Sequence, residues 1–293
     1  MSLDAVSIGL IGCRFVHYVT LMSLFGALLF PLYAGGAAAI ARPAATTRGL
    51  IAASLLAILS GLGWFAFTSA GMAGALSGAW DPATLRSVFE DTGFGPLWLC
   101  RIVGLVMVAA LVATARTGAR TLAVATSAAA LVSLAWTGHA NASEGAPGLA
   151  RRAADAAHLF SAGLWIGALP MLAARLQANA DAGAVFVVIS RFSRVAVPAV
   201  ALLVLSGVVN AAMILSAPRD LLTTEYGRWL GFKLGLVAAM LWLAAFNRRR
   251  LTPALRDGSA PAQRRRRLHT LIELALGIAV LGVVAVLGTL SPT

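Results

Sequence analysis

Charged residues are scarce in this chain, and acidic ones are the scarcest. Only 12% of the 293 residues are charged, and 11 residues are Asp or Glu. A soluble domain usually has about 25% charged residues, so an ordinary water-exposed surface is excluded. Hydrophobic residues make up 59% of the chain, and the mean hydropathy is +0.85. The composition therefore predicts an integral membrane protein.

The chain also lacks the signatures of soluble enzymes. It has no P-loop, no HExxH, no CxxC and no GxGxxG after a predicted strand. We therefore expect neither an enzymatic activity nor ATP-driven transport by this chain alone. Alternation with a period of two residues is absent as well, which argues against a membrane β-barrel. No internal repeat is evident.

Apolar runs long enough to cross about 30 Å of hydrocarbon occur eight times. Their approximate limits are residues 7–32, 47–70, 94–115, 121–138, 153–172, 194–215, 228–246 and 268–290. The first run has no basic segment before it and exceeds the usual core of a secretion signal, so we interpret it as a retained helix. The expected fold is an all-α polytopic bundle of eight transmembrane helices, forming a single domain over residues 1–293.

Basic residues in the connections indicate the orientation of the bundle. The odd-numbered connections carry most of them, including the arginine run 264–267, whereas the second connection holds Asp81, Glu90 and Asp91. By the positive-inside rule the odd connections are cytoplasmic, so both termini are expected to be periplasmic. Topology accounts for the net charge of +12, and we expect the lipid bilayer, not nucleic acid, as the partner of these charges.

Potential metal ligands gather in the outer half of the predicted bundle. His158 lies about 8 Å below the outer start of the fifth run, at about 1.5 Å per residue, and Asp155 is one turn above it. His17 lies near mid-membrane in the first run, with Cys13 one turn outward on the same face. His139 stands at the outer mouth of the fourth run.

Imidazole with a nearby thiol suits copper, which also binds most tightly among the divalent metals of its series. A carboxylate inside a membrane is costly and usually marks an ion path or an ion pair. Asp155 could orient the His158 imidazole or accept a proton released on binding; alternatively, Arg151, Arg152 or Lys233 neutralises it. We predict one copper site, reached from the periplasm, from these residues: His17, His158, His139, Asp155 and Cys13.

Four segments resemble the copper resistance protein D family of bacterial inner-membrane proteins. They are AHLFSAGLWIGALPML (157–172), RFSRVAVPAVALLVLSGVVNA (191–211), YGRWLGFKLGLV (226–237) and NRRRLTPAL (247–255). The resemblance implies an eight-helix protein that takes copper from the periplasm towards the cytoplasm, often beside a separate periplasmic carrier of the CopC type. It supports His158, Trp165 and Gly167 as family positions.

The alternative function is a membrane b-type cytochrome. Two histidines at similar depth on different helices could ligate one haem axially. Two haems would need four such histidines, two near each face, and only His269 lies on the inner side. His269 and Glu273 are four residues apart, so they are either an exit pair for copper or an interfacial pair on one helix.

Overall fold

The computed structural model describes residues 4–35, 44–114, 116–137, 145–177, 181–215 and 217–291. These residues form helices joined by turns, and the described ranges contain no strand. Eight helical spans in them are long and apolar enough to cross a membrane. The predicted all-α bundle with eight spans is therefore confirmed.

Each predicted apolar run coincides with one span. The spans are, in chain order, α1 (Ala5–Tyr33), α2 (Ala44–Ala73), α4 (Phe94–Ala113), α5 (Thr117–Val132) with η3 (Ser133–Trp136), α6 (Gly145–Ile166) with α7 (Leu169–Arg175), α8 (Ala182–Ile214), α10 (Glu225–Phe246) with η5 (Asn247–Leu251) and α11 (Thr252–Arg256), and α12 (Ala260–Leu287). The shorter elements η2 (Leu76–Ala79), α3 (Pro82–Glu90) and α9 (Asp220–Thr223) lie in connections.

Several helices begin earlier than hydropathy predicts. The α8 helix starts at Ala182, where the Asp181 carboxylate accepts a hydrogen bond from the backbone N–H of Ala184. The α12 helix starts at Ala260, where the Ser259 hydroxyl accepts one from Ala262. Hydropathy locates only the part of a helix that suits hydrocarbon, whereas backbone hydrogen bonds continue until a capping residue ends them.

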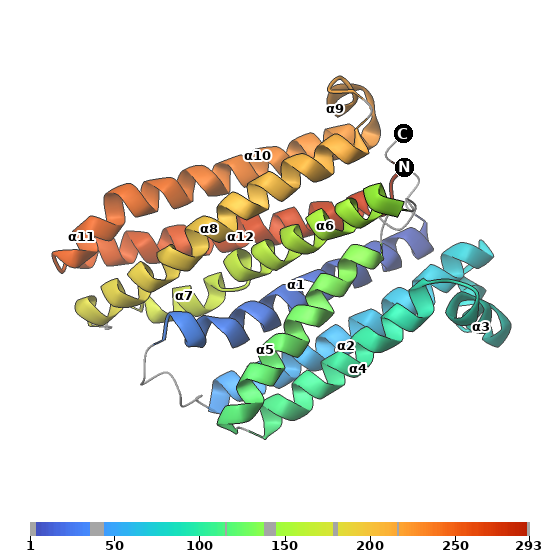
Figure 1. Cartoon of the computed structure of the whole chain (residues 1–293), viewed down its shortest axis with the longest axis horizontal. Helices are drawn as coiled ribbons and strands as arrows, with labels where there is room; N and C mark the ends of the chain where they lie inside the picture. Colours follow the sequence, from blue (N-terminus) through green and yellow to red (C-terminus); the bar gives the residue numbers. More distant parts are fainter. Residues whose placement is uncertain are drawn as a thin grey trace.

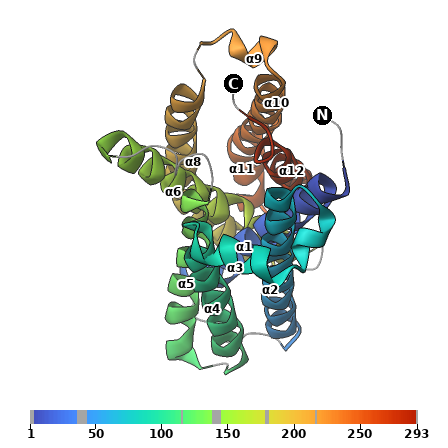
Figure 2. The same cartoon turned by 90° about the vertical axis from the view of Figure 1, so that its right-hand side faces the viewer.

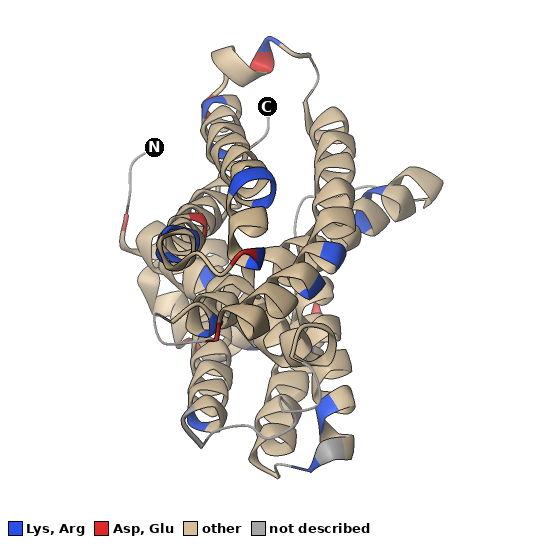
Figure 3. Cartoon of the chain, turned by 90° about the vertical axis from the view of Figure 1, so that its left-hand side faces the viewer, with Lys and Arg blue, Asp and Glu red and all other residues tan. Residues whose placement is uncertain are grey.

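Both termini lie at one end of the bundle, and the C-terminal ends of α1, α4, α7 and α11 lie at the other (Figure 1). Figure 3 faces the end with the odd connections and shows more basic than acidic residues. This distribution is consistent with the positive-inside rule. The periplasmic location of the termini stays a prediction.

The helices form two groups that follow the chain order. In the first half α1 packs on α2, and α4 packs between α2 and α5; in the second half α6 packs on α8, and α10 packs on α12. The groups meet where α1 contacts α6 and α12 and where α5 contacts α6. Figures 1 and 2 show α2, α4 and α5 on one side and α8 and α10 on the other.

Two glycines form the crossing between the halves. A Cβ atom at Gly26 on α1 would overlap the backbone of Gly167, and a Cβ atom at Gly167 would overlap the carbonyl of Met22. Small residues permit such close approach of membrane helices. Gly167 also lies between the end of α6 and the start of α7, three residues before Pro170, which has no backbone N–H to donate.

Candidate functional site

His17 is fully buried between α1 and α2. Its Nδ1 lies 2.9 Å from the carbonyl oxygen of Ala57 and 3.2 Å from the hydroxyl of Ser60. A carbonyl oxygen can only accept, so Nδ1 carries the proton and donates it. The other nitrogen, Nε2, then has a free lone pair, and it is buried without a hydrogen-bond partner. An imidazole whose Nδ1–H is fixed by a carbonyl is oriented to bind a metal through Nε2.

His158 on α6 repeats this arrangement against α8. Its Nδ1 lies 3.1 Å from the carbonyl oxygen of Leu203 and 3.3 Å from the hydroxyl of Ser206. The hydroxyl itself donates to the carbonyls of Leu202 and Leu203. The proton is therefore again on Nδ1, and Nε2 again keeps its lone pair.

The two histidine cradles share one sequence pattern. Residues 57–61 and 203–207 each supply a carbonyl, then a serine three residues later and a glycine after that. A Cβ atom added to Gly61 would lie 3.1 Å from the His17 ring, and one added to Gly207 would lie 3.2 Å from the His158 ring. Glycine therefore makes room for each imidazole. The sequence signal was the triplet Leu-Ser-Gly at 59–61 and 205–207, which the sequence analysis missed.

The similarity extends to the two halves as a whole. Gly26 follows His17 by nine residues (26 − 17), and Gly167 follows His158 by nine (167 − 158). The segment WLCRIVGLV (98–106) on α4 also corresponds to WLGFKLGLV (229–237) on α10. Because each half has four spans, both halves cross the membrane in the same direction. These correspondences argue for a repeat, against the expectation of none. Several of the shared residues lie at helix contacts, including Gly26 with Gly167, Gly61 beside His17 and Gly207 beside His158.

The charges beside the two histidines differ. Arg101 on α4 interacts electrostatically with His17. His158 instead has Asp155 one turn away on α6, and the charge of Lys233 on α10 acts on both of them. Asp155 also interacts with Arg151. Arg151, Arg152 and Lys233 were the three cations considered as partners of Asp155, and two of them, Arg151 and Lys233, act on its charge.

The remaining predicted ligands are Cys13 and His139. Cys13 lies one turn nearer the N-terminus of α1 than His17, and its Sγ fills the space beside Gly63 on α2. His139 lies outside the described residues. Within the described ranges, no group of three or more His, Cys, Asp or Glu side chains could hold a metal ion. Each cradle belongs to its own half, so the structure presents two separate imidazole positions.

His269 and Glu273 are joined through Asn247 at the opposite end of the bundle. His269 Nδ1 donates to the Asn247 side-chain oxygen at 2.7 Å, and the Asn247 amide donates to Glu273 at 2.6 Å. Arg266 lies 3.6 Å from the same carboxylate. These contacts connect α12 to η5, and a structural role accounts for them.

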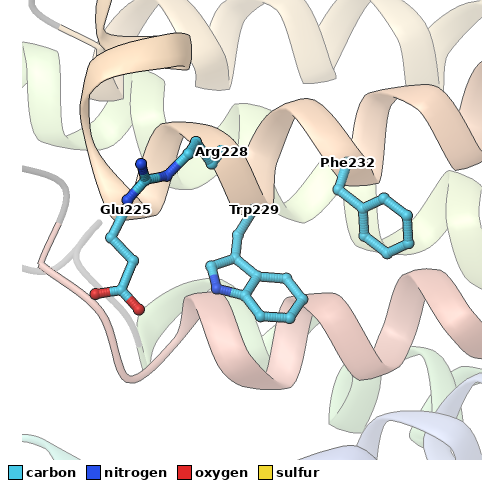
Figure 4. A pocket seen from close by; sticks show the side chains of 4 residues that line it. All are labelled: Glu225, Arg228, Trp229 and Phe232. Atoms are coloured by element: carbon cyan, nitrogen blue, oxygen red, sulfur yellow. The ribbon is translucent and has the colours of Figure 1, made fainter.

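Two cavities lie outside the cradles. One of about 620 Å³ at the start of α10 is lined by Glu225, Arg228, Trp229 and Phe232 (Figure 4). This lining contains neither imidazole nor thiol, the ligands that copper prefers. The other, of about 680 Å³, lies between α4 and α5, with Cys100 and Arg101 among the residues of its wall.

Comparison with known proteins identifies related chains along the whole length. The family model for the copper resistance protein D-like N-terminal domain matches residues 2–150, and the model for copper resistance protein D matches residues 186–287. The chain is 36% identical to copper resistance protein D of Pseudomonas syringae pv. tomato, over 96% of each protein.

Two further relatives extend this result. Identity is 31% with the inner membrane protein YebZ of Escherichia coli (strain K12), over 96% of this chain and 98% of the relative. It is 29% with the copper transport protein CutJ of Bacillus subtilis (strain 168), over 98% of this chain and 53% of the relative. No solved structure matches. None of the three names refers to haem, so the cytochrome alternative has no support.

Proposed function

The chain belongs to the copper resistance protein D family and is a multi-pass protein of the inner membrane, and from this premise we propose that it transports copper from the periplasm towards the cytoplasm. The observation that carries the proposal is the pair of histidine cradles, each with one imidazole whose Nε2 lone pair is free to bind a metal. Imidazole is a good copper ligand, and two of the three relatives are named for copper.

We propose His17 and His158 as the ligands of two copper positions at similar depth. They lie about 18 Å along α1 and about 20 Å along α6, at 1.5 Å per residue. Cys13 is the nearest thiol along α1 to the first position, and Asp155 is the carboxylate of the second. His139 is the expected first contact at the periplasmic mouth, and a separate CopC-type carrier is the expected donor.

Copper uptake into right-side-out membrane vesicles tests activity and direction together. We expect vesicles that contain the protein to accumulate radioactive copper faster than vesicles without it. Inverted vesicles from the same cells serve as the control for direction. Equal uptake in vesicles with and without the protein, or faster accumulation in the inverted ones, would contradict the proposal.

The serine of each cradle should tune the metal affinity of its histidine. We expect Ser206→Ala to weaken copper binding by about tenfold, the lower limit of the usual effect of groups that orient metal ligands. The matched control is Ser69→Ala on α2, because its buried hydroxyl bonds only to the carbonyl of Phe65. Isothermal titration of both purified variants measures the difference, and equal affinities would remove Ser206 from the site.

A further inference from the structure

Two guanidinium groups surround one indole ring beside His17. The Cζ atoms of Arg14 and Arg101 lie 5.2 Å and 5.7 Å from the centre of the Trp64 ring. His17 and Tyr18 meet the same ring edge-on, with centroids at 5.6 Å and 5.7 Å. Tyr18 also interacts electrostatically with both arginines. We call these five residues the Trp64 cluster.

The Trp64 cluster has two positive charges and no carboxylate. Ion pairs within the described ranges include Arg86 with Glu90 and Arg266 with Glu273, and neither involves the Trp64 cluster. Arg101 is only 2% exposed and lies about 10 Å along α4 from its start, at 1.5 Å per residue. A cation at this depth in a membrane protein normally pairs with an opposite charge or with backbone carbonyls, and Arg101 has one carbonyl partner, that of Ser133. Contacts with an aromatic ring compensate only in part.

Three polar atoms of the cluster are buried without a hydrogen-bond partner: Arg14 Nε, His17 Nε2 and Arg101 Nη1. The remaining nitrogens fix the two arginines in place. Arg101 donates from Nε and Nη2 to the hydroxyl and carbonyl of Ser133, at 2.8 Å and 3.2 Å. Arg14 donates from Nη1 to the carbonyl of Gly288. Each guanidinium therefore keeps a spare N–H in a place where buried donors are rarely left without an acceptor.

We propose that the Trp64 cluster binds a small inorganic anion of the halide class, held by the spare N–H groups of Arg14 and Arg101. We propose a small anion because aromatic rings occupy the surroundings of the cluster, with Phe94 packed on Trp64 at 6.0 Å. A lipid phosphate in the pocket between α4 and α5 would meet Arg101 but not Arg14, which is not part of that pocket's wall, so it would not take both spare N–H groups.

The anion also explains how a metal cation could bind beside two arginines. Like charges in a medium of low dielectric constant repel strongly, so copper on His17 Nε2 needs a negative group nearby. A halide supplies that charge and is itself a copper ligand, so copper would lie between the imidazole and the halide. In the second half the protein has its own acidic group beside the histidine, Asp155, which also interacts with Arg151 and Lys233. This step rests on the proposed function, whereas the anion site does not.

Equilibrium dialysis of the purified wild-type protein against radiolabelled chloride, without copper, tests the anion site. We expect stoichiometric chloride that bromide displaces and gluconate does not. Arg101→Gln should lose this chloride, whereas Arg86→Gln, an exposed arginine paired with Glu90 on α3, should retain it. Absence of bound chloride in the wild-type protein overturns the proposal, whatever the folding of the variants.

Copper binding to single-cradle variants tests the link between the two ligands. His158→Ala keeps only the first-half cradle, and His17→Ala keeps only the second. Replacing gluconate by chloride should tighten copper binding to His158→Ala by about tenfold, within the usual range of coupling between two ligands, and leave His17→Ala unchanged. If chloride binds but does not change the copper affinity of His158→Ala, the anion site stands and its link to copper is overturned. If neither variant binds copper, the proposed function fails, and the dialysis result still decides the anion site.

Discussion

Gly167→Leu is expected to prevent the two halves of the bundle from assembling. The new side chain would start at a Cβ atom that overlaps the carbonyls of Met22 and Gly163. Because both obstacles are backbone atoms, no change of side-chain rotamer relieves the overlap. Overpacking usually costs about 1–3 kcal/mol and more where the backbone must move. That is a large share of a typical folding stability of about 5–15 kcal/mol. Gly26→Leu should have the same effect from the other side of the crossing.

The amount of monodisperse protein after detergent extraction measures this effect. The control is Gly235→Leu on α10, where an added Cβ atom would meet nothing within 4 Å. Both variants replace a glycine by leucine, but only Gly167 lies at the crossing. If Gly167→Leu and Gly235→Leu yield the same amount of folded protein, the crossing does not determine assembly.

Hydropathy predicted the spans because it measures the one property that the bilayer selects. It could not predict the crossing, because the chain has 29 glycines and local sequence does not tell which of them meet another helix. Gly26 and Gly235 lie in equally apolar surroundings, yet only Gly26 touches a neighbouring backbone. Contacts between spans are properties of the tertiary structure.

The sequence predicted the histidines of the candidate site but not the residues that hold them. His17 and His158 stand out in an apolar sequence, but their hydrogen-bond partners are ordinary residues of α2 and α8. The repeated Leu-Ser-Gly triplets could have revealed the cradles. Arg14 and Arg101 lie within predicted apolar runs, and the cost of burying a cation could have identified them before the structure did. The pairing of both arginines with Trp64 required the structure.

Substituting both cradle histidines with alanine should abolish copper binding, and each single substitution should remove half of it. This expectation follows from the positions of the imidazoles, since His17 binds Ala57 and Ser60 on α2 while His158 binds Leu203 and Ser206 on α8. When two sites are independent, each substitution removes only the copper of its own site. A single ion held by both imidazoles would instead be lost with either one.

Metal analysis of the purified wild type, both single variants and the double variant distinguishes these cases. His269→Ala is the control, because its imidazole donates to Asn247 at the opposite end of the bundle and should leave copper content unchanged. If His17→Ala and His158→Ala each remove all copper, the two cradles act on one shared ion in a conformation that brings them together. The glycine crossing would then have to move, because Gly26 and Gly167 fix α1 and α6 in direct backbone contact. If each single variant keeps half of the wild-type copper content, each half of the bundle has its own copper position.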